Sequence, residues 1–293
     1  MRDISPTTSG DKATMLVTKR YSLITAVLPG ATDHLVECGQ SICQQEFLSP
    51  WGAEWLVWVD GTKEEADEIE ALIMADSTIK AAVRDKVILK VGFSTRHTGT
   101  AVCRNLALAS ASGEYVRQVD ADDMLVGGAL SADIKVMDGY RSRVYCASGT
   151  LNLYEDGSLH TWEGTPPEGI MRQRELYDMW SKNSGILEIY TGSVCARTDA
   201  VRVAGGWMGI WPNEDTGLLL MLSELGEGHY RKVPTMVYRF WDKASTSDFF
   251  AGEDLFSNPA FVNSAEALRS VIEAKREYAR KNGPNYRYVR DER

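Results

Sequence analysis

The sequence lacks any apolar run near the roughly 20 residues that a bilayer-spanning helix needs. Its opening stretch, MRDISPTTSGDKAT, also lacks the apolar centre of a secretory signal. We therefore expect a cytoplasmic protein without a membrane span. Positive charge is scarce as well, because 32 Lys and Arg stand against 41 Asp and Glu, a net charge of -9. This balance argues against a broad binding surface for nucleic acid or for an anionic membrane.

Cysteine is scarce too. The chain has five cysteines, an odd number, and no C-x-x-C pair. This usage argues against a disulfide framework or a zinc site and fits reduced thiols in the cytoplasm. No internal repeat or clear linker divides the 293 residues, and their number suits one large α/β domain or two small ones.

The most informative stretch, residues 104–124, reads RNLALASASGEYVRQVDADDM. The apolar residues of its first half predict a helix, which the Ser-Gly pair at 112–113 ends. The β-forming residues of segment 115–119 then predict a strand. Three carboxylates follow at the end of this strand, namely Asp120, Asp122 and Asp123. Because ligands of open α/β sheets bind at the carboxyl ends of strands, we expect the functional site here.

Three aspartates within four residues repel one another unless a cation lies between them. Mg²⁺ and Mn²⁺ prefer carboxylate oxygen, and Mg²⁺ usually takes one or two protein carboxylates together with water and substrate phosphates. The DADD segment therefore suits a metal ion that bridges to a diphosphate. The alternative is a solvated acidic turn, since aspartate is common in turns.

Hydrophobic segments at residues 21–28, 55–59 and 87–91 predict three further strands. Asp33 is expected to cap a helix after the first of them, and residues 64–74 predict an acidic surface helix after the second. This β-α-β-α-β order predicts an α/β fold with a mostly parallel, Rossmann-like sheet and right-handed crossovers.

The second half of the chain predicts both helices and strands. The expected helices cover residues 124–137, 174–183, 213–225 and 263–282, and the expected strands cover 143–147, a hairpin at 151–159 and 233–240. Four tryptophans here could stack on a sugar or an apolar group, with core packing as the alternative: Trp162, Trp180, Trp207 and Trp211.

Two groups of motifs resemble the family two inverting glycosyltransferases, which have the nucleotide-diphospho-sugar-binding GT-A fold. The first group is Arg104-Asn105, Gly113-Glu114-Tyr115 and Asp120-Ala121-Asp122-Asp123, and the second is Gly205-Gly206-Trp207 followed by Glu214-Asp215. The resemblance implies a GT-A domain over residues 21–250, with a nucleotide-binding half (21–125) and an acceptor half (126–250). Residues 1–20 would be a lead-in and residues 251–293 a helical extension.

The resemblance also implies a nucleotide site formed by Thr25, Ala26, Val27, Asp60, Arg104, Asp120 and Arg239. Asp60 would accept a hydrogen bond from N3–H of uracil, which favours a UDP-linked donor. Asp122 would be the principal ligand of Mn²⁺ or Mg²⁺, with Asp120 and Asp123 beside it. The second strand of family members usually ends in two aspartates, and the chain has Val59 in place of the first of them. Many members also have a histidine after a late strand, and here Trp241 lies near that place. The metal shell would then depend on the aspartates, substrate and water, or on Asp242.

For catalysis, the resemblance implies that Asp215 is the base that deprotonates the acceptor, with Glu214 positioning the acceptor or the base. The alternative is that both acidic residues simply favour the start of a helix, where its dipole is positive. The Q-x-x-R-W pattern of processive synthases is absent, so we expect a non-processive enzyme with a small-molecule or glycan acceptor.

The leading interpretation is thus a metal-dependent, inverting glycosyltransferase. One alternative is a sugar-phosphate nucleotidyltransferase, but its basic, glycine-rich loop has no counterpart in residues 29–32. The other is a binding protein without catalysis on the same scaffold, which would need no base at Asp215.

Overall fold

The computed structural model describes residues 19–47, 50–162, 164–241 and 258–282. The elements of the first half are β1 (Lys19–Val27), α1 (Leu35–Cys43), β2 (Trp51–Val59), α2 (Lys63–Ala75), α3 (Ser77–Asp85), β3 (Val87–Phe93), α4 (Thr100–Ser110) and β4 (Tyr115–Gln118). Those of the second half are β5 (Met124–Leu125), α5 (Ala129–Gly139), β6 (Tyr145–Leu153), β7 (Leu159–Thr161), β8 (Gly169–Met171), α6 (Glu175–Lys182), η1 (Thr191–Ser193), β9 (Cys195–Arg197), α7 (Thr198–Ala204), α8 (Glu214–Leu225), β10 (Gly228–Arg239) and α10 (Pro259–Asn282).

One continuous sheet has the strand order β3-β2-β1-β4-β9-β6-β10-β5. The four strands from β3 to β4 are parallel, as the β-α-β-α-β pattern predicts, and β6 and β10 are parallel as well. Strand β9 is antiparallel to both of its neighbours and joins the two parallel groups. The predicted fold class, a mixed α/β fold with a mostly parallel central sheet flanked by helices, is confirmed.

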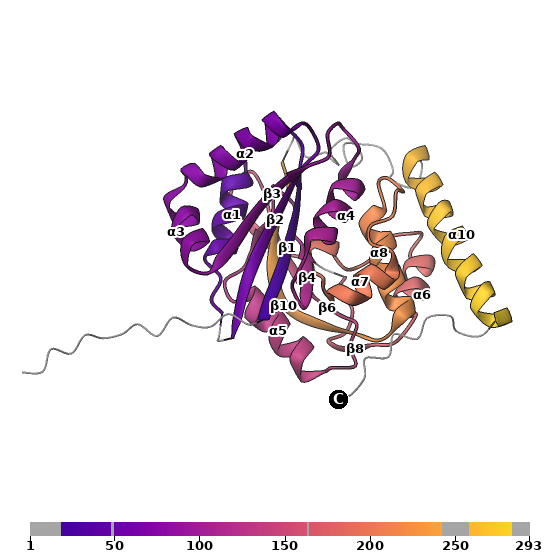
Figure 1. The fold of residues 1–293 in the computed structure, drawn as a ribbon. Helices are drawn as coiled ribbons and strands as arrows, with labels where there is room; N and C mark the ends of the chain where they lie inside the picture. The colour runs from indigo at the N-terminus through magenta and orange to yellow at the C-terminus, as the bar shows by residue number, and fades with distance from the viewer. Residues whose placement is uncertain (1–18, 48–49, 163, 242–257, 283–293) are drawn as a thin grey trace, which may run out of the picture.

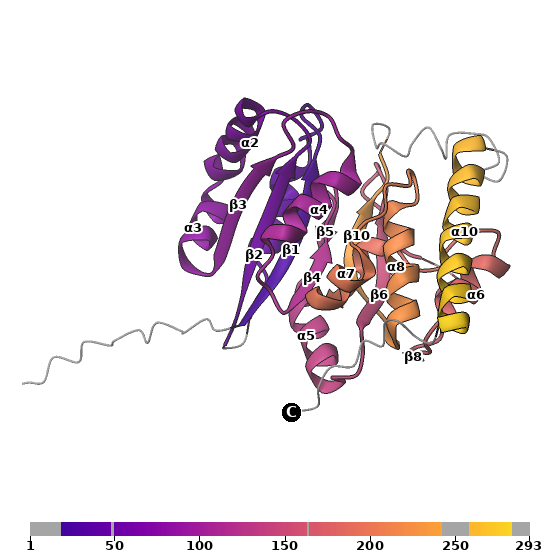
Figure 2. The same ribbon diagram turned by 45° about the vertical axis from the view of Figure 1, so that its right-hand side comes forward.

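Helices cover both faces of this twisted sheet (Figure 1). On one face, α1, α2, α3 and α5 pack over a core that includes Trp55 and Tyr115. On the other face, α4, α6, α7 and α8 enclose a second core around Trp180 and Leu222. Helix α10 lies outside that second layer, where Figure 2 shows it running beside α8, and it contributes Leu268 and Ile272 to the core.

The register of the parallel strands brings the predicted site residues to one edge of the sheet. Val27 at the end of β1 pairs with Val59 at the end of β2, and Asp60 follows directly. Strand β4 pairs with β1 up to Gln118, opposite Ile24, so the DADD segment leaves the sheet at the same edge. This arrangement is the one in which open α/β sheets bind ligands.

Local predictions differ from the structure in several places. Residues 77–85 form the helix α3, capped by the Asp76 carboxylate, where none was expected. Residues 124–137 were expected to be helical throughout, but Met124 and Leu125 pair with β10 as strand β5, and the helix begins only after Gly128, whose φ is 78°. The N-cap position of α1 is occupied by His34 and not by Asp33.

Several predictions concern residues outside the described ranges, including residues 1–18 of the lead-in, the chain end and Asp242 as a substitute metal ligand. Residues 19 and 20, which were expected to belong to the lead-in, begin β1. Within the described ranges, no helix has both the length and the apolar character needed to cross a bilayer. All five cysteines are free and buried.

Candidate functional site

Asp60 follows β2 and is 8% exposed. Its Oδ1 accepts from the backbone N–H of Thr98 (2.6 Å) and from the hydroxyls of Ser94 and Thr98, and its Oδ2 accepts from the N–H of Gly99 (3.0 Å). Burial opposes ionisation, but these donors outweigh it and hold the pKa of Asp60 below its ordinary value. Asp60 therefore anchors the loop that leads into α4.

The three candidate nucleotide-binding residues of β1 differ in exposure. Thr25 is buried, and its hydroxyl accepts from the indole N–H of Trp55 at 2.9 Å. Val27 is also buried, and its carbonyl accepts from the N–H of Asp60 at 2.8 Å. Ala26 between them is half-buried. Of the three side chains, Ala26 is the one that is partly exposed, and their role in nucleotide binding stays a prediction.

Arg104, from helix α4, connects the two groups of motifs. Its Nη2 donates to Asp120 Oδ1 at 2.7 Å, and its Nη1 donates to Glu214 Oε1 at 3.0 Å. The guanidinium is nearly fully buried, so both contacts are charge-assisted hydrogen bonds in a poorly solvated place. The first carboxylate of the DADD segment and the glutamate at the start of α8 are thus held on one side chain.

Asn105 makes the second connection between the same parts. Its Nδ2 donates to the carbonyl of Trp207 (2.8 Å), and its Oδ1 accepts from the N–H of Trp207 (2.9 Å). The preceding Gly206 fits because it has no Cβ, which would lie 2.1 Å from Asn105 Oδ1. Asn105 therefore fixes the glycine-rich segment that leads towards α8.

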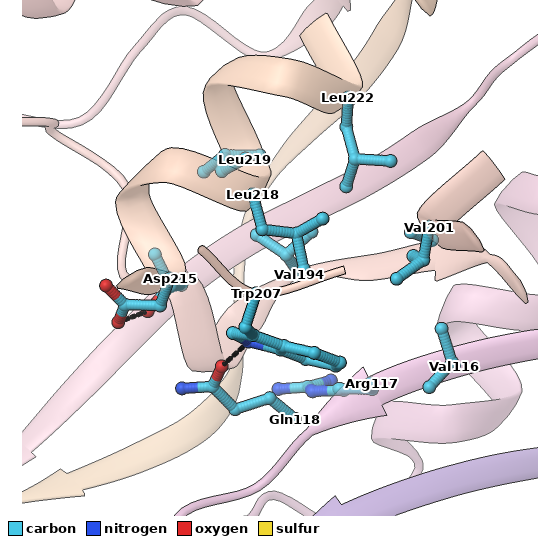
Figure 3. A pocket seen from close by; sticks show the side chains of 12 residues that line it. Val116, Arg117, Gln118, Val194, Val201, Trp207, Asp215, Leu218, Leu219 and Leu222 are labelled. Carbon is cyan, nitrogen blue, oxygen red and sulfur yellow. Dashed lines mark hydrogen bonds between the residues drawn. The ribbon is translucent and has the colours of Figure 1, made fainter. Parts of the chain in front are cut away.

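Gln118 was not among the residues singled out from the sequence. Its side-chain oxygen accepts from the indole N–H of Trp207 at 2.8 Å, and its Nε2 donates to both oxygens of Asp120, at 3.3 and 3.2 Å. Figure 3 shows the indole of Trp207 beside Gln118. Together with Arg104, Gln118 orients the carboxylate of Asp120. The signal available in the sequence was a polar residue near the end of a β-forming segment, two positions before Asp120.

Of the other two aspartates of the DADD segment, Asp123 is buried, whereas Asp122 is half-buried like Asp120. Asp122 Oδ2 accepts from the indole N–H of Trp241 (2.8 Å), and Asp123 Oδ1 accepts from the backbone N–H of Arg239 (3.0 Å). Burial, followed by repulsion from neighbouring aspartates, raises the pKa of both carboxyls, while the Trp241 donor partly opposes the shift at Asp122.

Arg239 lies against the DADD segment. Its Nε donates to the carbonyl of Asp122 at 3.0 Å, and its Nη2 donates to the Glu37 carboxylate. The guanidinium is thus beside the DADD segment. Its contact with a diphosphate stays a prediction.

The donor set at the sheet edge consists of carboxylates, the oxygen ligands that Mg²⁺ and Mn²⁺ prefer. Among the described residues, no group of three or more His, Cys, Asp or Glu side chains lies close enough to hold a metal ion. An all-protein metal cage is therefore not formed here. A second binding mode needs only one or two protein carboxylates, because substrate phosphate and water complete the shell of Mg²⁺ or Mn²⁺. The DADD segment, in which burial and repulsion between aspartates raise the pKa of Asp122 and Asp123, fits this mode.

Glu214 and Asp215 form the first turn of α8. Burial, and then the charge of Asp215, raise the pKa of Glu214 from 4.5 to about 7, against the opposing effect of Arg104. The Asp215 carboxylate accepts from the hydroxyl of Thr191. The two neighbouring acids are therefore different: Glu214 is tied to Arg104, and Asp215 is half-buried and oriented by a neutral hydroxyl.

A small cavity of about 30 Å³ lies beside Asp215, between α8, α7 and the sheet (Figure 3). Its walls are mainly apolar, and the polar groups at its margin are Asp215, Thr191, Arg117 and Gln118. This volume suffices for about one water molecule. The cavity is too small for a nucleotide or a sugar.

The sequence matches no family model, and no curated protein matches it. Among solved structures, S. aureus TarS 1–349 is similar, with a TM-score of 0.56 and 18% identity, over 90% of this chain and 74% of that one. The same TarS fragment in complex with UDP-GlcNAc gives a TM-score of 0.58 at 18% identity, and in complex with UDP 0.55 at 17%, over the same shares. At this identity, the likeness shows a shared fold.

Proposed function

We propose that this protein is a glycosyltransferase that moves a sugar from a nucleotide-diphospho-sugar, with UDP as the nucleotide, to a hydroxyl of an acceptor. The observation that carries the proposal is the bridge of Arg104 between Asp120 and Glu214. This bridge brings a candidate metal and nucleotide site and a candidate base together at the ligand-binding edge of the sheet. The fold likeness to TarS, which was solved with UDP-GlcNAc and with UDP, supports the same assignment.

In the proposed reaction, Asp215 acts as the general base. The acceptor oxygen attacks the anomeric carbon, its proton passes to Asp215, and the bond from that carbon to the diphosphate oxygen breaks with its electron pair on the diphosphate. Attack from the side opposite to the leaving group inverts the configuration. Thr191 holds Asp215 by donating a hydrogen bond, and Glu214 positions this base through its fixed place on Arg104.

Asp122 and Asp120 would hold Mn²⁺ or Mg²⁺, which as a Lewis acid would offset the charge of the departing diphosphate. On the protein side, Arg104 compensates part of the charge of Asp120, and the Trp241 indole donates to Asp122, near the place of a histidine in the family that the motifs resemble. Arg239 adds a guanidinium on the same side of the site.

Asp60 remains the candidate for reading the base. Three N–H or O–H donors contact Oδ1, and one, the N–H of Gly99, contacts Oδ2. A lone pair of Oδ2 is therefore available for the N3–H of uracil.

A direct assay tests the proposed function. The protein is incubated with Mn²⁺, a panel of UDP-sugars and candidate glycoside acceptors, and the release of UDP is measured against the same mixtures without acceptor. Acceptor-dependent release is expected. Pyrophosphate formation from a sugar phosphate and a nucleoside triphosphate would instead identify a nucleotidyltransferase, and UDP binding without release from any donor would identify a binding protein.

A further inference from the structure

A second concave region lies beside the candidate site, on the hairpin formed by β6 and β7. This hairpin groove has an open volume of about 670 Å³, within the usual size range of ligand pockets. Its walls are formed by Asn152, Tyr154, Leu159, His160, Thr161 and Trp162. Nothing in the proposed roles of the DADD segment or of α8 uses this groove.

The antiparallel pairing of the hairpin explains the arrangement of polar and aromatic groups. Asn152 on β6 and His160 on β7 are cross-strand partners, so their side chains project from the same face. Tyr154 lies two positions after Asn152, and Trp162 lies two positions after His160. Because side chains alternate between the two faces of a strand, both rings share the face of Asn152 and His160. The tyrosine and imidazole rings meet edge to face, with their centroids 5.5 Å apart.

Aromatic contacts connect the groove to the candidate catalytic residues. The ring of Trp162 lies 4.9 Å from that of Tyr190, and the next residue, Thr191, donates to Asp215. The ring of Tyr190 in turn lies 4.6 Å from that of Tyr238, which precedes Arg239. The groove, whose lining belongs to the acceptor half of the chain, is therefore connected to the proposed base through Trp162, Tyr190 and Thr191.

The groove also contains an unused ring surface and an unused acceptor atom. Tyr154 stacks one face on Phe240, with the ring planes 5° apart, yet remains 40% exposed. Asn152 is only 4% exposed, and within the described part of the chain its Oδ1 is buried without a hydrogen-bond partner. A buried amide oxygen without a donor is unfavourable, so a ligand hydroxyl that donates to it would be stabilised there.

The charge of the groove restricts the ligand further. Its lining, as described, contains no Lys or Arg, and the Asp215 carboxylate lies beyond the aromatic contacts. An anionic ligand would find no counter-charge among these walls. A neutral ring with several hydroxyls matches the aromatic surface, the amide and the imidazole.

We propose that the hairpin groove is the acceptor subsite and that it binds a neutral sugar ring, stacked on Tyr154 and hydrogen-bonded to Asn152. The acceptor would thus be a glycoside or a neutral glycan, with its reacting hydroxyl directed past Tyr190 towards Asp215. The assignment as an acceptor site rests on the proposed function, whereas the binding of a neutral sugar does not.

Binding is measured by saturation-transfer NMR and by calorimetry with a panel of methyl glycosides and neutral disaccharides, at saturating UDP and Mn²⁺. Tyr154→Ala and His160→Ala should each weaken binding of the best ligand about tenfold or more, while Tyr154→Phe should keep wild-type affinity. Tyr140→Ala is the matched control, because Tyr140 is 49% exposed and, like Tyr154, contacts a histidine ring, but it lies outside the groove. UDP affinity should stay unchanged in all four variants.

Three results would overturn the proposal: no neutral glycoside binds, an anionic sugar or polyol phosphate binds in preference, or binding is unchanged in both alanine variants. His160 is exposed, so its alanine variant tests the groove even if Tyr154→Ala does not fold. The two proposals fail separately. If glycosides bind but UDP is never released, the proposed glycosyltransferase activity is wrong. If acceptor-dependent UDP release is the same in the variants as in wild type, the assignment of the groove as the acceptor subsite is wrong.

Discussion

Arg104 Nη1 lies 3.0 Å from Glu214 Oε1, although the two residues are 110 positions apart in the chain. Both side chains are largely buried, at 5% and 11% exposure. A buried ion pair of this kind is poor evidence for stability in itself, because desolvation offsets much of the attraction. Its position is more informative, since the same guanidinium also holds Asp120 and so sets the distance between the two halves of the candidate site.

The first prediction concerns the proposed base. Asp215→Asn keeps the shape of the side chain but cannot accept a proton, so kcat should fall by roughly 10²–10⁴-fold. UDP affinity, measured by calorimetry, should change less than about twofold. Thr191→Val removes only the hydroxyl that orients Asp215 and should lower kcat by a smaller factor. An Asp215→Asn enzyme with a tenth or more of the wild-type rate would contradict the assignment.

The second prediction concerns the metal ion. UDP binding should be tighter with Mn²⁺ than with EDTA, because a diphosphate beside Asp120 and Asp122 is repelled in the absence of a cation. Asp122→Ala should remove this difference. Asp123→Asn is the matched control and should reduce it less, because Asp123 is 2% exposed and one of its oxygens accepts from the Arg239 amide. Equal UDP affinity with Mn²⁺ and EDTA in the wild-type protein would show that DADD is only an acidic turn.

The third prediction concerns pH and stability. The folded protein raises the pKa of Glu214 from 4.5 to about 7, so the folded state binds this proton more tightly than the unfolded state. The resulting stabilisation is fully present below about pH 4.5 and is lost as the pH rises to about 7. In EDTA, the fall in the free energy of unfolding between pH 5 and pH 8 should therefore be smaller in Glu214→Gln than in wild type, by on the order of 2 kcal/mol.

Urea titrations at several pH values measure this difference. The exposed Glu64 of α2 supplies the control, because Glu64→Gln should leave the pH dependence as it is in wild type. Parallel curves for wild type and Glu214→Gln would show that Glu214 does not titrate in this range.

The fourth prediction concerns the segment that Asn105 holds. Gly205 and Gly206 both have positive φ values, 96° and 71°, so alanine at either position should cost about 1–2 kcal/mol of backbone strain. A Cβ at 205 meets nothing within 4 Å, whereas one at 206 would overlap Asn105 Oδ1. Gly206→Ala should therefore destabilise the protein by about 1–2 kcal/mol more than Gly205→Ala, since it also disturbs the two hydrogen bonds to Trp207.

A double-mutant cycle isolates this contact. In an Asn105→Ala background, the two glycine substitutions should cost nearly the same, because the overlapping oxygen is gone. Equal costs already in the wild-type background would show that the segment simply moves away from Asn105.

Local patterns in the sequence were enough to predict the elements that carry the motifs. These elements include the β-forming segment that ends in DADD and the apolar helix that begins at Glu214. Both follow from the periodicity of side chains and from the residues that start or end an element, and these signals act over only a few positions of the chain. For the same reason the parallel order of the first strands could be predicted, as could the edge of the sheet at which Asp60 and Asp120 lie.

Only the tertiary structure decided which of these residues touch. Strand β5 forms because Met124 and Leu125 pair with β10, more than 100 positions later, and this pairing overrides a helical pattern. The roles of Gln118 and Asn105 depend on Trp207, which no local pattern connects to either of them. Long-range hydrogen bonds and burial are properties of the packed chain, and they set both the raised pKa of Glu214 and the bridge that Arg104 makes across the site.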